Sequence, residues 1–239
     1  MFYEYSNTLI QLLEQVEQVN KQAIATLASE FARCIKEDKI IHLFGTGHSH
    51  MMGVELFARA GGLGNIDPLL DPCTLTSFGA QRAGKMEQTC GVSDVIYDAY
   101  QFEKGDVMIV TSNSGRNAMP IEMAKRCHDE GIYVVALTSY HQSKASTSRH
   151  PSGKKLYEFA DLVLDTCVPS GDVLVNIEGI KTGSASSIAS MFLLDLIVCE
   201  AIRISMAQGV RPYVFQSQNV DGFNNDEIYA KFASRIKHY

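Results

Sequence analysis

Two short segments rich in glycine and hydroxyl side chains are candidate anion-binding sites. One reads GTGHSH over residues 45–50, between an apolar run at 40–44 and a helical pattern that begins near Met51. The other reads TSNSGRN over residues 111–117 and follows the apolar run 107–110. Glycine lets the backbone approach a ligand closely, and a helix N-terminus offers free N–H groups and a positive partial charge. Both segments therefore suit a phosphate group.

In the first segment, Gly47 and Ser49 are expected to line the anion site. His48 and His50 have side chains that bind substrate oxygen or transfer protons near neutral pH. Neither a dinucleotide fingerprint nor a P-loop is expected, because His50 replaces the third glycine and no Gly-Lys-Ser/Thr follows. Together with His150, these two histidines would suit zinc or nickel. No local spacing fixes a third ligand, however, so we predict no metal ion.

In the second segment, three short polar side chains stand next to Gly115, and Asn117 is a candidate N-cap for the helix that follows. Hydroxyl and amide groups beside free backbone N–H groups form a compact cradle for a small phosphate. The alternative is that these residues only cap the helix and the turn. The three side chains are those of Ser112, Asn113 and Ser114.

Buried strands are expected to position these segments. Four apolar, β-branched runs alternate with helical patterns, which is typical of parallel strands joined by helical crossovers. The runs are residues 40–44, 107–110, 132–138 and 162–164, with a weaker fifth run at 65–69. Helices are expected at 51–60, 119–130, 184–206 and 226–237. The polar stretch 139–155 is either a ligand-binding loop or a solvated surface loop, and His42 is expected to be a satisfied core residue.

An amphipathic pattern covers residues 5–36 near the start of the chain. It exceeds the usual roughly 8 to 20 residues of a globular helix, so it is expected to bend near Val19 and Asn20 or to pack on a second subunit. We favour the subunit contact and predict a homodimer or a higher homo-oligomer. The expected domain organisation is an N-terminal helical segment, 1–38, followed by a single compact unit, 39–239.

Composition argues against several classes of partner. Of 239 residues, 21 are Lys or Arg and 27 are Asp or Glu, which gives a net charge of -6 and argues against nucleic acid. No apolar stretch reaches the roughly 18 to 20 residues of a membrane span. The start of the chain has no export signal, so we expect a cytoplasmic protein without a membrane partner. The six cysteines are widely spaced and are interpreted as reduced, small core residues.

The second segment carries a resemblance to a known family. Its Ser-x-Ser-Gly core, residues 112–115, followed by a helix and the apolar run 134–138, resembles the sugar isomerase, or SIS, domain. The resemblance covers residues 39–199. The family includes phosphoheptose isomerase, N-acetylmuramic acid 6-phosphate etherase and the isomerase half of glucosamine-6-phosphate synthase. The likeness is strongest to bacterial SIS proteins labelled phosphoheptose isomerases, and it extends through residues 148–154 and 214–222.

Together with the strand pattern, the resemblance implies a fold and roles for individual residues. The fold is a flavodoxin-like, three-layer α/β/α sandwich with about five parallel strands. In the family the loop binds the sugar phosphate, and that role passes to Ser112, Asn113, Ser114 and Asn117. Arg116 stands where an acidic or small residue is common, and Asn117 replaces the usual threonine.

The expected reaction is the aldose–ketose isomerisation of a sugar phosphate, which removes a proton next to a carbonyl and needs a base. Glu87 is the first choice, because SIS isomerases and etherases place an acid or base on this helical segment. Glu55 is the second choice, although Ala58 stands where phosphoheptose isomerase has its carboxylate. His48 or His50 would assist, and no cofactor is expected. The alternatives are a non-catalytic sugar-phosphate sensor and a phosphosugar lyase or etherase.

Overall fold

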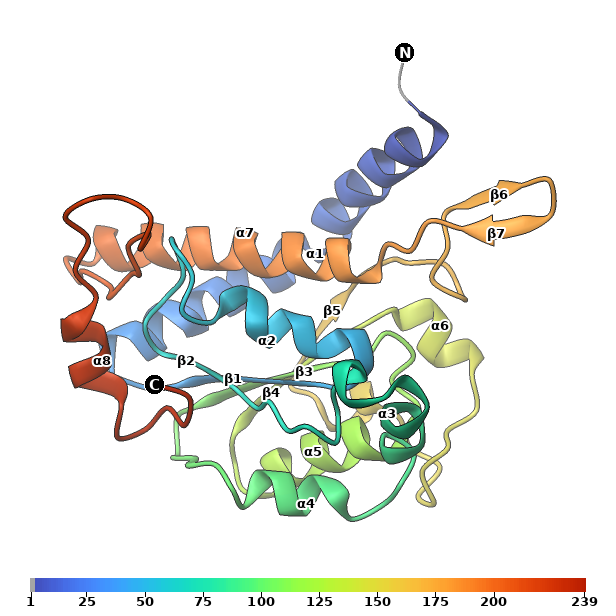
Figure 1. The fold of residues 1–239 in the computed structure, drawn as a ribbon, viewed down its shortest axis with the longest axis horizontal. Coiled ribbons are helices and arrows are strands. Elements are labelled where there is room, and N and C mark those ends of the chain that lie inside the picture. The colour runs from blue at the N-terminus through green and yellow to red at the C-terminus, as the bar shows by residue number, and fades with distance from the viewer. Residues whose placement is uncertain (1–2) are drawn as a thin grey trace.

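A five-stranded parallel sheet lies at the centre of the computed structural model, which describes residues 3–239 (Figure 1). Its strands are β1 (Ile41–Gly45), β2 (Ile66–Pro68), β3 (Val107–Thr111), β4 (Tyr133–Thr138) and β5 (Leu162–Asp165). Their order is β2-β1-β3-β4-β5, and each neighbouring pair is parallel. This is the flavodoxin-like order, so the predicted fold is confirmed, including its weakly marked strand β2.

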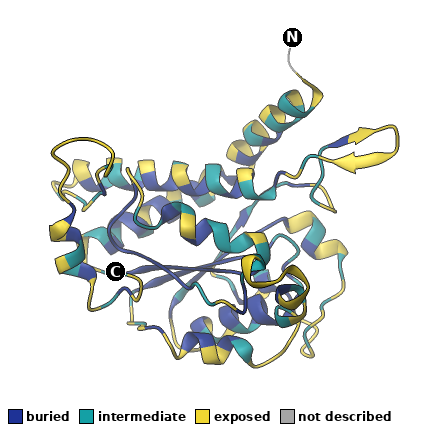
Figure 2. Ribbon diagram, in the orientation of Figure 1, coloured by how far each residue is buried: buried dark blue, intermediate teal, exposed yellow. Residues whose placement is uncertain are grey.

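Strands β1 and β3 are buried on both faces, whereas the edge strand β5 is half-buried (Figure 2). In the central strands, alternate side chains enter separate apolar clusters on the two sides of the sheet. In β3, Val107 and Ile109 face one cluster, whereas Met108 and Val110 face the other. In a strand with two buried faces, apolar and polar residues do not alternate, because both sets of side chains face a core. This is why these runs are almost continuously apolar in the sequence.

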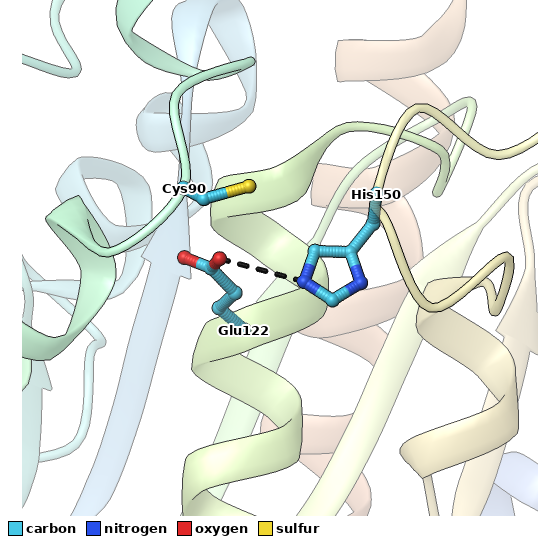
Figure 3. A group of neighbouring side chains, drawn as sticks. All are labelled: Cys90, Glu122 and His150. Carbon is cyan, nitrogen blue, oxygen red and sulfur yellow. Dashed lines mark ion pairs between the residues drawn. The ribbon is translucent and has the colours of Figure 1, made fainter.

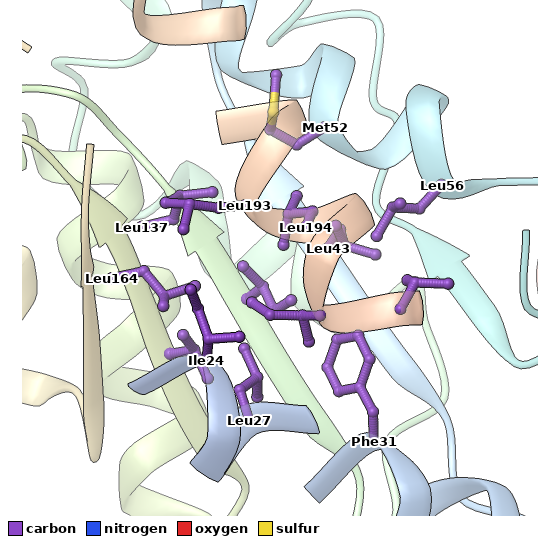
Figure 4. Packing of buried hydrophobic residues seen from close by; sticks show 14 of the residues in the cluster. Ile24, Leu27, Phe31, Leu43, Met52, Leu56, Leu137, Leu164, Leu193 and Leu194 are labelled. Atoms are coloured by element: carbon purple, nitrogen blue, oxygen red, sulfur yellow. The ribbon is translucent and has the colours of Figure 1, made fainter. Parts of the chain in front are cut away.

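Helices cover both faces of the sheet and complete the three layers (Figure 1). On one face they are α1 (Glu4–Lys36), α2 (Met51–Leu56) and α7 (Ser186–Ala207). On the other they are α4 (Val92–Tyr97), α5 (Ala118–Asp129) and the 3-10 helix η3 (Leu156–Phe159). Figure 4 shows the first face, where Ile24 and Leu27 of α1, Leu193 of α7 and Leu137 of β4 lie in one apolar cluster.

The long helix α1 is continuous from Glu4 to Lys36 and has no break at Val19 or Asn20. The Asn20 side chain is buried and donates to the carbonyl oxygen of Asp165 (2.7 Å), and it accepts from the Asp165 N–H (2.8 Å). Strand β5 is at the edge of the sheet, and these bonds satisfy backbone groups that no neighbouring strand can reach. Asn20 therefore fixes α1 to the sheet.

Helix α2 ends earlier than its sequence pattern indicates. It stops at Leu56 instead of Ala60, because Phe57 is extended and Ala58 has a positive φ of 49°. The Phe57 ring leaves the helix and stacks on Tyr239, with ring centroids 5.2 Å apart. A contact with the far end of the chain thus overrides the local helical pattern.

Other helices lie close to the predicted ranges, but the chain after α7 is less regular. Helix α8 (Asp226–Phe232) stops before Lys237. The stretch 139–155 is not loop throughout, since it contains α6 (Tyr140–Ala145). Helix α3 (Ala80–Met86) precedes Glu87, where a helical segment is expected. Within residues 3–239, no helix is long and apolar enough to cross a membrane.

The structure contains a projecting antiparallel hairpin that the sequence did not predict. It consists of β6 (Val175–Ile177) and β7 (Ile180–Thr182) and extends away from the sheet (Figure 1). Its turn residues Glu178 and Gly179 both have positive φ, as two-residue hairpin turns with the favoured twist require. At its tip, Ile177 and Ile180 are 56% and 70% exposed.

The six cysteines are all free but differ in burial. Cys34, Cys73 and Cys127 are buried, as the interpretation as small core residues requires, and Cys167 is half-buried. Cys90 and Cys199 are exposed, so that interpretation is wrong for these two residues.

A buried ionic cluster joins the amino half of the sheet to the C-terminal segment. His42 Nδ1 lies 3.0 Å from Asp67 Oδ2, and its Nε2 lies 3.3 Å from Asp106 Oδ2, with all three side chains fully buried. Arg235 donates to the same Asp106 oxygen (2.8 Å). Burial disfavours the imidazolium, but the hydrogen bonds to Asp106 and Asp67 outweigh this effect and raise the pKa of His42. His42 is therefore a satisfied core residue, as expected.

Candidate functional site

The loops that follow the central strands meet at the carboxyl edge of the sheet, next to the N-terminus of α7 (Figure 1). Residues from both candidate anion-binding segments line a small polar cavity there. In open α/β sheets, ligands bind at this edge. The lining residues are Ser49, Met52, Thr111, Asn113, Leu137, Thr166, Ser186, Ser187 and Ser190.

The first segment forms a tight turn and the 3-10 helix η1 (Gly47–His50). Only glycine fits at position 45, because a Cβ on Gly45 would lie 2.4 Å from the carbonyl oxygen of Ser49. Gly47 has a positive φ of 57°, and its N–H donates to the carbonyl oxygen of Thr74 (2.9 Å). That N–H is therefore already used, and the segment presents the Ser49 side chain to the cavity.

The second segment is held in a compact turn. Gly115 has a positive φ of 56°, and a Cβ there would lie 2.8 Å from Ser143 Oγ. The Ser112 side chain is buried, and its hydroxyl accepts from the Gly115 N–H (3.2 Å). Ser112 thus stabilises the shape of the turn through its side chain.

Asn113 and Ser114 differ in how much of their hydrogen-bonding capacity is free. The Asn113 amide donates to Gln142 Oε1 (2.9 Å) and accepts from Thr166 Oγ1 (3.0 Å), so it connects the loops after β3, β4 and β5. The half-buried Ser114 hydroxyl makes no hydrogen bond to residues 3–239, and the Asn113 and Ser114 N–H groups donate to no acceptor in that range. These three groups are free to bind a ligand.

Glu87 lies between the two segments and contacts both of them. It follows the last residue of α3, and its carbonyl oxygen accepts from the Met119 N–H at the start of α5 (3.0 Å). Thr46 Oγ1 donates to Glu87 Oε2 (2.8 Å), and Asn117 Nδ2 donates to Glu87 Oε1. Asn117 occupies the predicted N-cap position, but its side chain bonds Glu87 instead of the helix N-terminus.

The environment of Glu87 changes its acidity. Burial raises the pKa of its carboxyl above the usual value, and the hydrogen bond from Thr46 and the positive charge of Arg149 oppose that rise in part. Arg149 Nη1 also donates to Asn117 Oδ1 (3.1 Å), so Asn117 joins the carboxyl to the guanidinium. A carboxyl whose pKa is raised in this way is suited to proton transfer.

Sequence reasoning assigned no role to Thr46 or to the positive charges beside the site. Arg116 donates to Thr147 Oγ1 (3.1 Å), and its buried Nε has no partner among residues 3–239. The backbone N–H of Arg149 donates to the carbonyl oxygen of Arg116 (2.8 Å). The sequence feature that could have identified Arg149 is its position in the polar stretch 139–155, which directly follows a predicted central strand.

The histidines do not form the three-ligand set considered from the sequence. His48 is exposed, and a ring nitrogen of the half-buried His50 contacts the carbonyl oxygen of Gly47. His150 lies 3.4 Å from Glu122, and within residues 3–239 no group of three metal-ligating atoms contains His48 or His50.

Glu55 makes a different contact. It lies on α2, one turn beyond the first segment, and its carboxylate pairs with Arg59 four residues along. The structure therefore places Glu87, and not Glu55, in direct contact with both segments.

The N-terminus of α7 lies at one side of the cavity, and the carboxylate of Asp172 binds its free N–H groups. Asp172 accepts from the N–H groups of Ala185 (3.1 Å) and Ser186 (2.7 Å) and from the Ser186 hydroxyl (2.6 Å). This carboxylate satisfies the end of the helix. Ser187 and Ser190 remain on the cavity wall.

Comparison with known proteins identifies relatives for most of the chain. The sequence model of a family described as SIS domain matches residues 4–139. A UPF0309 protein of Halalkalibacterium halodurans is 36% identical over 236 residues, which cover 97% of each chain. A UPF0309 protein of Caldanaerobacter subterraneus is 33% identical over 241 residues, which cover 98% of each chain.

Solved structures share the fold at lower identity. Phosphoheptose isomerase from Neisseria gonorrhoeae gives a TM-score of 0.55 at 20% identity and covers 83% of this chain and 93% of its own. The Vibrio vulnificus NanR protein, solved in complex with ManNAc-6P, gives a TM-score of 0.53 at 16% identity. That match covers 86% of this chain and 63% of the NanR chain.

The first prediction concerns the titration of Glu87. Replacing Arg149 with glutamine removes a positive charge that favours the carboxylate, so Arg149→Gln should raise the pKa of Glu87 further above the ordinary 4.5. The added shift should shrink at high salt, because Arg149 is exposed. Carbon-13 NMR of the Glu87 carboxyl across pH measures this. Arg203→Gln, an exposed arginine on α7, is the control, and a lowered pKa in Arg149→Gln would contradict the assignment.

Proposed function

This chain belongs to the SIS domain family, and on that premise we propose that it binds a sugar phosphate and interconverts its aldose and ketose forms. The observation that carries the proposal is the position of Glu87, a half-buried carboxyl held between two polar segments at the carboxyl edge of the sheet. The segments offer hydroxyl and N–H groups for a phosphate, and the carboxyl offers a base. The proposed reaction needs no cofactor.

We place the phosphate over the cavity, between Ser49 and the loop 112–117. Ser114 supplies a free hydroxyl and a free N–H group, and Asn113 contributes its N–H. Thr111 Oγ1 is buried on the cavity wall without a partner among residues 3–239. A phosphate oxygen would satisfy that hydroxyl, and the Arg116 guanidinium would offset the negative charge.

Four of the predicted phosphate ligands take a supporting role in this proposal. Gly47 and Ser112 shape the two turns, and Asn113 holds the second turn against its neighbours through its side-chain amide. Asn117 orients Glu87 through its Nδ2 donor. Of the side chains predicted as phosphate ligands, these contacts leave Ser49 and Ser114 to meet the phosphate directly, together with the Thr111 hydroxyl.

In the proposed reaction, the Glu87 carboxylate takes the proton from the carbon next to the carbonyl of the open-chain sugar. The electrons of the broken C–H bond form a carbon–carbon double bond, and the carbonyl oxygen becomes the oxygen of an enediol(ate). Glu87 then returns a proton to the adjacent carbon. A raised pKa suits this exchange, because a general base works best when its pKa is near the operating pH. His48 and His50, beside Ser49, are the groups proposed to move the oxygen protons.

A second candidate function is the binding of a sugar phosphate without turnover. The observation in its favour is that each Glu87 oxygen already accepts one hydrogen bond, from Thr46 or from Asn117, so Glu87 also fits a structural bridge. A phosphosugar lyase or etherase would use the same proton abstraction and then eliminate a group from the neighbouring carbon.

The second prediction concerns self-association in the cytoplasm, where we expect the protein to act. Ile10 and Val19 of α1 and Ile177 and Ile180 of the hairpin are 46–70% exposed, and burial between subunits would remove them from water. Light scattering at micromolar concentration should give at least twice the mass of one chain. Ile177→Lys with Ile180→Lys should reduce that mass, and a single-chain mass for the unmodified protein would refute the proposal.

The third prediction concerns phosphate affinity. A hydrogen bond to a charged group contributes about 1.5 to 3 kcal/mol, so Ser114→Ala should weaken sugar-phosphate binding by about tenfold to a hundredfold. Calorimetry with the same ligand measures the change. Ser29→Ala, at an exposed serine on α1, is the matched control and should bind as the unmodified protein does. Unchanged affinity in Ser114→Ala would remove this loop from the site.

The fourth prediction concerns the base. A panel of hexose, heptose and amino-sugar phosphates incubated in deuterium oxide should include one whose α proton exchanges with solvent, as NMR detects. Glu87→Gln should slow this exchange by about 10² to 10⁴-fold, the usual contribution of a general base.

Three other outcomes have distinct meanings. Exchange lost in Glu55→Gln but retained in Glu87→Gln would move the base to Glu55. Binding without exchange across the panel would favour the binding-only function. Exchange that ends in loss of a substituent, instead of a ketose or aldose, would identify a lyase or etherase.

A further inference from the structure

A second group of reactive side chains lies outside the proposed sugar-phosphate site. Cys90 follows α3, Glu122 lies on α5 and His150 lies in the stretch 139–155, and the three side chains point toward one another (Figure 3). One sulfur, one carboxylate oxygen and one ring nitrogen all lie within 4.8 Å of each other. Three separate segments of the chain therefore converge on one point.

The spacing is close to that of a metal site. Tetrahedral zinc sites have bonds of about 2.0 to 2.3 Å, which put neighbouring ligand atoms about 3.3 to 3.8 Å apart. His150 Nε2 and Glu122 Oε1 already lie 3.4 Å apart. The Cys90 side chain is exposed, so a small rotation of that side chain can bring its sulfur to the same distance.

Surrounding hydrogen bonds orient two of the three ligands. Glu122 Oε2 accepts from the Gly91 N–H (2.8 Å) and the Ser93 hydroxyl (2.9 Å), which leaves Oε1 directed at His150. His150 Nδ1 lies 2.7 Å from Ser152 Oγ and accepts from the Ser152 N–H (3.2 Å), so in the metal-free protein the proton of the neutral imidazole is on Nε2, directed at Glu122. A metal at Nε2 would displace that proton, and Nδ1 would then carry the imidazole proton with Ser152 Oγ as its acceptor.

We propose that Cys90 Sγ, Glu122 Oε1 and His150 Nε2 bind a divalent zinc-like metal ion. Thiolate and imidazole select zinc and its neighbours among the transition metals and disfavour magnesium and calcium, which prefer oxygen ligands. A thiolate and a carboxylate together supply two negative charges that balance the ion. The fourth position is open to water, because Cys90 lies at the surface.

The bound ion would join three segments that also carry residues of the sugar-phosphate site. Cys90 lies three residues after Glu87, and His150 directly follows Arg149. Glu122 is on the helix whose N-cap is Asn117. Metal binding would therefore restrain Glu87, Asn117 and Arg149, but the metal site itself does not depend on the proposed reaction.

The experiment measures zinc binding by the full chain in competition with a chelating dye. The unmodified protein is expected to bind one equivalent of zinc. Cys90→Ser, Glu122→Gln and His150→Gln are each expected to weaken zinc binding by about tenfold or more, because even the loss of a residue that only hydrogen-bonds a metal ligand weakens metal binding about tenfold. Cys199→Ser and His128→Gln, at another exposed cysteine and another exposed histidine, are matched controls and should bind normally. Binding should also weaken as pH falls, because the ligands must lose their protons.

A second measurement needs no variant. Zinc should slow the alkylation of Cys90 and leave that of Cys199 unchanged in the same molecule, as mass spectrometry of the two peptides can show. Cobalt should give a thiolate charge-transfer band that is absent in Cys90→Ser. Equal binding by the unmodified protein and all three ligand variants, or alkylation of Cys90 that zinc does not change, would overturn the proposal.

Discussion

Burial of the sheet on both faces is the constraint on which the rest of the structure depends. Because helices cover the two faces, the middle of strands such as β3 contains only apolar side chains, and the strand backbone is satisfied by neighbouring strands. Apart from the buried pair of His42 in β1 and Asp67 in β2, polar side chains therefore lie toward the strand ends. All five strands are parallel, so their carboxyl ends lie at one edge, and loops far apart in the sequence meet there. The candidate site follows from this geometry before any particular residue is considered.

Glu87 connects two of these loops through hydrogen bonds to its carboxylate. Its side chain accepts from Thr46 after β1 and from Asn117 after β3, and Asn117 accepts in turn from Arg149. The same contacts have two opposed effects on chemistry. They hold the carboxyl in place, which favours proton transfer at a fixed position, but they stabilise its ionised form and moderate the rise in pKa that burial causes.

Local sequence features were sufficient for the strands, which are short apolar runs, and for the turn at Gly115, which has the Ser-x-Ser-Gly pattern at residues 112–115. They were insufficient where a distant contact decides the outcome. The role of Asn20 was missed because the partner of its side chain, Asp165 of β5, lies 145 residues away in the sequence. Phe57 ends α2 because Tyr239 offers it a stacking surface. The hairpin at Val175–Thr182 was missed because its strands are only three residues long and face solvent. Arg149 was missed because its contact with Asn117 spans 32 residues.

The two polar regions of the sheet show how structural and ligand-binding groups can be told apart. The side chains of His42, Asp67 and Asp106 are fully buried. Asp106 accepts from His42, Arg235 and two backbone N–H groups, so the charges compensate one another. One oxygen of Asp67 has no partner among residues 3–239, but the lining residues of the carboxyl-edge cavity do not include this cluster. At the carboxyl edge, the Thr111 hydroxyl, which also has no partner in that range, lies on the cavity wall with Ser49 and Ser187. An unsatisfied buried donor costs about 1 to 3 kcal/mol, so the Thr111 hydroxyl on this cavity wall, and not the compensated cluster at His42, has the character of a ligand-binding group.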